Sequence, residues 1–282
     1  MAGEYACAPR LGNRARAHYV CTMPIAHLAD RAVLAVSGPE ARGFLQGLVT
    51  NDMELGGARY AALLTPQGKI LFDFIVVERD DAFHVDCAKA TRDALQKRLT
   101  LYRLRAKVEI APRDDLSVMA AWDGGELPNS FSDPRLPELG LRAIAPTGRG
   151  DADYLSHRLA FGVPEAADFG QDKIFALDAG LHELNAVSFT KGCYVGQELT
   201  ARMKHRGTAR KRLLLVESLD SSAIIADATI TAETREIGNI TSVYGARGFG
   251  LIRLDRLAEA GTAPLNANGI PVRVTKQSWL TA

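Results

Sequence analysis

Residues 191–202 read Lys-Gly-Cys-Tyr-Val-Gly-Gln-Glu-Leu-Thr-Ala-Arg, and this stretch is more informative about fold and function than any other. It places one thiol, Cys193, between Gly192 and Gly196, a spacing typical of a tight turn or a close backbone approach where a Cβ would clash. The first and last residues of the stretch are cationic, and positive neighbours favour the thiolate. On chemistry alone two readings stay open: a reactive thiol, or a small buried hydrophobic residue at a loop–helix junction.

The spacing Lys-Gly-Cys-Tyr-x-Gly-Gln-Glu-x-x-x-Arg also resembles the signature of the YgfZ-type iron–sulfur cluster assembly proteins, folate-binding relatives of the glycine-cleavage aminomethyltransferase (T-protein). Further blocks that resemble this family are Phe44–Asp52, Gln67–Asp73, Tyr102–Val108, Gly238–Ser242 and Gly250–Arg253. The resemblance covers residues 24 to 275, and the blocks look closest to the branch shared by alphaproteobacteria and mitochondria.

The resemblance implies an α+β, aminomethyltransferase-like multi-domain fold around a central folate cleft, with a C-terminal antiparallel β-barrel. The length of 282 residues agrees with more than one domain. The expected division is a flexible N-terminal tail (1–22), a folate-binding α+β core (23–115 and 165–205), a second α+β subdomain with a loop-rich connection (116–164) and the barrel (206–282). For the tail, a weak amphipathic leader and an over-extended start before Met23 are the alternatives.

Residue patterns agree with this division. Strands are predicted at 31–38, 60–65, 70–77, 82–86 and 116–121, and short strands of period two at 212–217, 236–243, 248–254 and 271–275. Helices are predicted after Pro39, after Thr91 as an N-cap residue, and over 151–159. Glycines and prolines make residues 123–150 look like a loop-rich connection.

Composition excludes several classes of protein. A net charge of +1 gives no general reason to expect nucleic-acid or membrane binding, and no apolar run approaches the ~20 residues that span a bilayer. The four cysteines are scattered, which favours reduced thiols in a cytosol, and therefore a cytoplasmic location, over a disulfide framework. Their scatter also argues against a cluster held by this chain alone.

The resemblance implies Cys193 as the reactive residue, acting as a transient ligand of iron or sulfur or by exchange with a client thiol. No resident metal is expected. Gly192 and Gly196 are expected to shape the turn. The residues implied for folate binding are Asn51, Asp73, Lys191, Tyr194, Gln197, Glu198 and Arg202. Local structural roles remain the alternatives for Asn51 as a turn residue, Asp73 at a strand end and Glu198 at a helix terminus.

Two basic stretches, 89–107 and 202–212, are either solvated faces or a rim for an anionic ligand such as a folate with a polyglutamate tail. The expected function is a folate-dependent accessory role in assembly, insertion or repair of [4Fe–4S] clusters, with a tetrahydrofolate, client enzymes and other cluster-assembly proteins as partners. The rival is a tetrahydrofolate-dependent aminomethyl or one-carbon transferase with Asp73 as the acid–base group. Related transferases carry two adjacent acids where this chain has Phe72-Asp73, which puts aminomethyl transfer in doubt.

Overall fold

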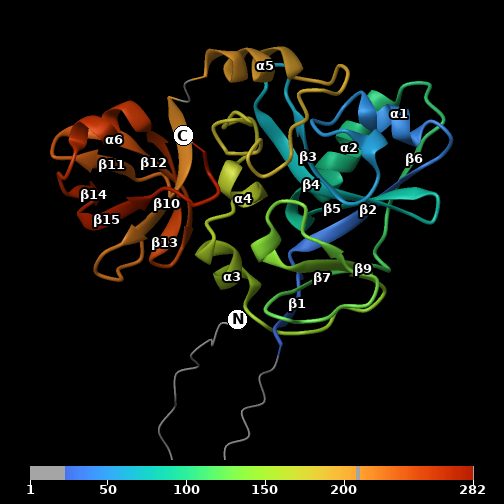
Figure 1. Cartoon of the computed structure of the whole chain (residues 1–282), viewed down its shortest axis with the longest axis horizontal. Coiled ribbons are helices and arrows are strands. Elements are labelled where there is room, and N and C mark those ends of the chain that lie inside the picture. Colours follow the sequence, from blue (N-terminus) through green and yellow to red (C-terminus); the bar gives the residue numbers. More distant parts are fainter. Residues whose placement is uncertain (1–22, 208–209, 282) are drawn as a thin grey trace, which may run out of the picture.

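The computed structural model describes residues 23–207 and 210–281, so the expected tail at 1–22 lies outside the described residues. Figure 1 shows two β-sheets on one side of the molecule, a β-barrel on the other, and short helices between them. This arrangement confirms the predicted α+β fold with a C-terminal antiparallel barrel.

The first sheet has five strands joined by antiparallel pairing. In spatial order they are β3 (Arg59–Leu64), β4 (Ile70–Arg79), β5 (Ala82–Ala88), β2 (Arg31–Ser37) and β6 (Glu109–Pro112). Strand β4 is buried on both faces, because Ile75 packs into the core shared with the second sheet while Phe74 packs into a core beneath the helices. The nearly continuous apolar sequence of this strand agrees with burial on both faces.

Helices α1 (Ala41–Gln46) and α2 (Arg92–Arg103) bury their apolar residues in that second core. Leu95 and Leu99 are buried, as their spacing of four residues predicts. Thr91 does precede α2, but the prediction of a side-chain cap is wrong. Its hydroxyl donates instead to the carbonyl of Ala88, at 3.3 Å, because a 3₁₀ turn leads directly into the helix.

The second sheet has the order β1 (Ile25–His27), β7 (Ser117–Ala121), β9 (Leu141–Ala145) and β8 (Phe131–Ser132). Strands β8 and β9 lie inside residues 123–150, where a loop-rich connection was expected. Strand β1 pairs with β7, so its residues belong to this sheet, although the expected boundaries grouped them with the first.

Three short helices lie along the segment that connects the sheets to the barrel: α3 (Tyr154–Ala160), α4 (Ala166–Phe169) and α5 (Gln197–Arg206). Figure 1 shows α3 and α4 between the sheets and the barrel, and α5 above α4 at the top of the molecule.

The barrel closes through six antiparallel strands around its own apolar core. In order around the barrel they are β10 (Lys211–Ser218), β13 (Arg247–Arg253), β12 (Arg235–Tyr244), β11 (Thr229–Ala232), β14 (Leu265–Ala267) and β15 (Ile270–Thr275), with helix α6 (Leu254–Ala260) after β13. The short strands β11 and β14 were not predicted. None of the described helices is long and apolar enough to cross a membrane.

Candidate functional site

The residues around Cys193 form a loop, residues 188–196, that we call the thiol loop. Its first residue is tied to the first sheet, because the amide of Ser188 donates to the carbonyl of Thr50 at 2.9 Å. The hydroxyl of Thr50 in turn donates to the carbonyl of Ala186 at 2.6 Å and accepts from the amide of Ala62 at 2.8 Å. The loop therefore begins at a fixed point of the sheet.

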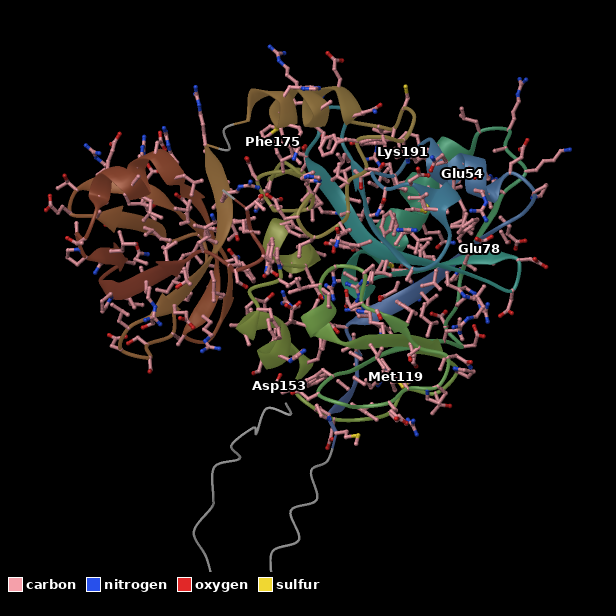
Figure 2. The ribbon with its side chains drawn as sticks, in the orientation of Figure 1. Glu54, Glu78, Met119, Asp153, Phe175 and Lys191 are labelled. Atoms are coloured by element: carbon pink, nitrogen blue, oxygen red, sulfur yellow. The ribbon has the colours of Figure 1, made fainter. Side chains whose placement is uncertain are left out.

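Lys191 anchors the middle of the loop from inside the protein. Its ammonium donates to the carbonyls of Gln46, Val49 and Asn51 at 2.7, 2.7 and 2.8 Å, and the residue is only 7% exposed. Burial lowers the pKa of Lys191 to about 8. Figure 2 places Lys191 next to the end of the first sheet, below the thiol loop. Its three donors are all used by backbone carbonyls, so Lys191 has no donor left for a hydrogen bond to folate or to the thiolate.

The other end of the loop is held by Tyr194 and Gly196. The ring of Tyr194 is buried, 5.4 Å from the ammonium of Lys191. Gly196 has a φ of +83°, and a Cβ there would lie 2.5 Å from the carbonyl oxygen of Thr65. Gly192 is exposed, its φ is outside the left-handed region, and a Cβ would meet nothing within 4 Å, so the structure gives only Gly196 a reason to be glycine.

Cys193 is exposed between these two anchors. Among the described residues the other free cysteine is Cys87, which is buried in β5 and whose pKa burial raises to about 12. Within the part of the chain that is described, Cys193 is therefore the one thiol that a reagent or a partner reaches.

Helix α5 begins directly after the loop. Gln197, its first residue, is half-buried, and Glu198 and Arg202 are exposed one turn apart. The latter two line a small surface pocket of about 230 Å³ with Pro66, Gln67 and Leu199. These side chains are available to a partner that approaches the thiol loop.

Asn51 and Asp73 do not join the thiol loop as ligand contacts. The amide of Asn51 donates to the carbonyls of Tyr60 and Asn185 at 2.8 and 2.7 Å, and its oxygen accepts from the amide of Asp52 at 2.8 Å. These bonds favour a structural role for Asn51. Both of its amide N–H donors are used within the fold, and no donor remains for folate.

Asp73 is 2% exposed and accepts a hydrogen bond from the hydroxyl of Tyr60 at 3.0 Å. Its other oxygen, Oδ1, has no partner among the described residues. Burial raises the pKa of Asp73 to about 6, against the opposing effect of the Arg31 guanidinium. Asp73 is thus a buried carboxyl group, and one of its oxygens forms no hydrogen bond with a described residue.

A buried set of ion pairs that was not expected from the sequence forms what we call the central charge cluster. Its members are Arg31, Arg135, Arg142, Arg158, Asp86, Asp133, Glu165 and Asp168. Burial would raise the pKa of Asp133, but the guanidinium groups of Arg135 and Arg142 hold it at about 2. The sequence feature that could have predicted this cluster is an arginine within an apolar segment, such as Arg142 in β9.

The structure also contains two larger cavities. The central cavity, of about 420 Å³, lies between the sheets, α3, α4 and the barrel, and Arg31, Tyr154, Glu165 and Tyr244 are among its lining residues. The α5 cavity, of about 490 Å³, lies between α5, residues 173–178 and the barrel. Neither cavity is lined by any of the residues expected to bind folate. Of the residues expected to bind folate, only Glu198 and Arg202 line one of the pockets described here, the small surface pocket beside α5.

Comparison with known proteins agrees with the fold and the loop signature. The family model for the C-terminal beta-barrel domain of CAF17 matches residues 210–282. The mitochondrial iron–sulfur cluster assembly factor IBA57 of Homo sapiens is 35% identical over 89% of this chain and 82% of its own length. The Mus musculus protein of the same name is 34% identical over 82% of this chain and 77% of its own.

A solved structure, the glycine cleavage system aminomethyltransferase T from Bartonella henselae, superposes with a TM-score of 0.70 over 91% of this chain and 86% of its own. At 16% identity this likeness concerns the fold alone. The comparisons confirm the predicted family resemblance.

The expected cytoplasmic location is wrong by the same comparisons. The human, mouse and Neurospora crassa relatives are all named as mitochondrial proteins. Scattered free cysteines indicate a reducing compartment, and they do not distinguish one such compartment from another.

Proposed function

The chain belongs to the IBA57 family of iron–sulfur cluster assembly factors, and from this premise we propose that it assists the assembly, insertion or repair of [4Fe–4S] clusters in client enzymes, with Cys193 as the working thiol. Its partners are then client enzymes and other cluster-assembly proteins. The observation that carries this proposal is an exposed thiol between two rigidly held residues.

The geometry of the thiol loop suits a sulfur atom that binds a cluster held by a partner protein. Lys191 and Gly196 fix the backbone on either side of Cys193, so little conformational entropy remains to be lost when the sulfur binds iron or a client thiol. The thiolate is the species that binds iron or exchanges with a client thiol. Glu198 and Arg202 lie on the following helix and provide charged contacts for the approaching protein.

The aminomethyltransferase-like fold supports a folate dependence. Asn51 and Lys191 have no free donors, and Asp73 is buried. Direct hydrogen bonds to a tetrahydrofolate are therefore assigned to other residues, and the chemistry of cluster assembly proposed for Cys193 does not depend on the folate.

The rival function, a one-carbon transferase, requires an acid that reaches the substrate. Asp73 is buried against Tyr60, and its neighbour Phe72 is buried as well. Formation of methylenetetrahydrofolate from an aminomethyl donor by the purified protein would support the transferase. We expect none.

The test of the assembly function is complementation of a strain that lacks this protein, with the activities of several [4Fe–4S] enzymes as the readout. We expect Cys193→Ala to lower these activities to the level of the deletion, while Cys87→Ala restores them. Alkylation by iodoacetamide should also label Cys193 well before Cys87 in the folded protein. Full complementation by Cys193→Ala would contradict the assigned role.

A further inference from the structure

The exposed side of α2 and the turn after it carry apolar and cationic side chains together. Leu104 and Leu101 are 87% and 70% exposed, the two highest values for large apolar residues in the described ranges. The cations around them are all exposed: Lys97, Arg98, Arg103, Arg105 and Lys107. We call these seven residues the α2 patch. Figure 1 shows α2 on the side of the molecule that holds the sheets, away from the barrel.

Helical spacing makes the α2 patch one continuous surface. Leu101 lies three and four residues after Arg98 and Lys97, so the three side chains share a face of α2. Leu104 follows as the C-cap residue, three positions further on. The opposite face of α2 is buried in the core beneath the helices. The patch is therefore not the surface that attaches α2 to the sheet.

The cations of the α2 patch form no ion pair with a described residue. Residues 94–108 contain no acidic residue, and Arg92 is the only cation of residues 92–107 with an ion pair in the described part of the chain. Glu40 accepts from the backbone amide of Lys107 rather than from a cationic side chain. Cations near the end of a helix interact favourably with its dipole, which accounts for part of this charge. That effect gives no reason for two exposed leucines among the cations.

The backbone of Leu104 is strained. Its φ is +48° and its ψ is −106°, a conformation that glycine adopts at lower cost than a residue with a Cβ. Because the side chain is almost fully exposed, packing within the folded chain offsets little of this cost. Strain of this kind is common at binding sites. Contact with a partner therefore explains a leucine at this position better than the stability of the fold does.

We propose that the α2 patch docks an acidic segment of a partner protein. The carboxylates of the segment pair with the cations, and its apolar side chains cover Leu101 and Leu104. Tyr102 of α2 and Val195 of the thiol loop pack against the same core, so the patch and the thiol loop lie on the same half of the molecule. The identification of the partner as a client enzyme or a cluster-assembly protein rests on the function proposed above.

Two other kinds of partner fit the α2 patch less well. A helix that binds a membrane inserts its apolar face into the lipid, but the apolar face of α2 is buried in the protein. A single-stranded nucleic acid binds through aromatic side chains on which its bases stack, and Tyr102, the aromatic residue of this segment, packs against the core. The exposed leucines therefore favour a protein.

Fluorescence anisotropy of a labelled peptide tests the docking surface on the full chain. The probe is a peptide of about 15 residues that consists of glutamates with leucines at helical spacing. Leu104→Gly removes an apolar contact and relieves the backbone, so we expect binding about 5- to 10-fold weaker and a denaturation midpoint no lower than that of wild type. A structural role for Leu104 would lower that midpoint. Arg98→Glu should weaken binding about 10-fold or more, because it replaces an attraction with a repulsion.

The control variants are Leu219→Ser and Lys276→Glu, which change exposed residues of the C-terminal domain in the same way and should bind the peptide as wild type does. No binding at about 1 mM peptide, or binding that Leu104→Gly and Arg98→Glu both leave unchanged, overturns the proposal. Binding of phosphatidylserine vesicles or of single-stranded RNA in place of the peptide, lost with Arg98→Glu, overturns it in favour of a membrane or a nucleic acid.

Complementation of the deletion strain separates the α2 patch from the thiol. Leu104→Gly and Arg98→Glu should lower the activities of [4Fe–4S] enzymes, while iodoacetamide should alkylate Cys193 as fast as in wild type. Full complementation by both variants, where Cys193→Ala fails, overturns the proposal for the α2 patch and leaves the function of Cys193 intact.

Discussion

Gly196 shows how a single residue determines the shape of the thiol loop. Its φ of +83° is unfavourable for a side chain, and an added Cβ would lie 2.5 Å from the carbonyl oxygen of Thr65. We therefore predict that Gly196→Ala lowers the free energy of unfolding by about 2 kcal/mol or more. Gly192→Ala is the matched control and should change it by less than about 0.5 kcal/mol. Urea denaturation of both variants measures the difference, and equal stabilities would show that the loop relaxes around the new Cβ.

Asp73 gives a pH dependence with a defined sign. Its pKa in the folded protein is about 6 and its ordinary value is 3.8, so between these pH values the folded state binds more protons than the unfolded state. Stability contributed by this group is complete below pH 4 and is lost as the pH rises through 6. Asp73→Asn should consequently stabilise the protein at pH 7, by on the order of 2–3 kcal/mol.

The advantage of Asp73→Asn should disappear near pH 4, where the native carboxyl group is protonated too. Unfolding curves for both proteins at several pH values measure it. An advantage that is the same at pH 4 and pH 7 would assign the effect to packing rather than to ionisation.

Lys191 holds the whole thiol loop in place, because its ammonium connects this loop to the end of α1 and the residues that follow it. Lys191→Met keeps the apolar stem and leaves three buried carbonyls without this donor. We predict a loss of about 2–4 kcal/mol of stability and faster amide hydrogen exchange in residues 188–196.

The control for this variant is Lys97→Met on the exposed face of α2, which should change stability by less than about 0.5 kcal/mol. Exchange in the thiol loop that stays as slow as in wild type would mean that Tyr194 and Gly196 hold the loop without the lysine.

The elements differ in how far the sequence predicts them. Strands β2 to β5 of the first sheet were predictable because they combine apolar runs with polar turns, such as the turn at Asp80-Asp81, whereas β6 was not predicted. Strand β9 was not, because Gly140 and Pro146 on either side of five residues resemble a loop, and only the pairing with β7 makes a strand of them. Strands β11 and β14 are too short to show a period.

The residues of the candidate site also differ in how far the sequence predicts their roles. The role proposed for Cys193 and the turn at Gly196 both rest on residues that are adjacent in the sequence. The role of Lys191 does not, since the carbonyls that it binds lie 140 to 145 residues earlier in the chain.

At the scale of the whole molecule, the central charge cluster connects the three β structures. Arg142 of the second sheet pairs with Asp86 of the first, and also with Asp133 at 2.8 Å. Asp168 in α4 pairs with Arg158 at 2.8 Å and accepts from the hydroxyl of Tyr244 in the barrel at 2.8 Å. Buried ion pairs of this kind contribute little net stability compared with apolar residues, but they fix the relative positions of the elements that supply them.

Removal of one partner from this cluster should therefore cost much more than removal of an exposed pair. Arg142→Met leaves Asp86 and Asp133 short of a buried countercharge, and we predict a loss of about 3–5 kcal/mol. Arg235→Met, which breaks the exposed pair with Glu259, should cost less than about 1 kcal/mol. Denaturant unfolding measures the two losses, and hydrogen exchange locates them. Because Arg142 joins two sheets, its loss should speed exchange in β5 as well as in β9. Faster exchange confined to β9 would mean that each sheet holds its position without the other.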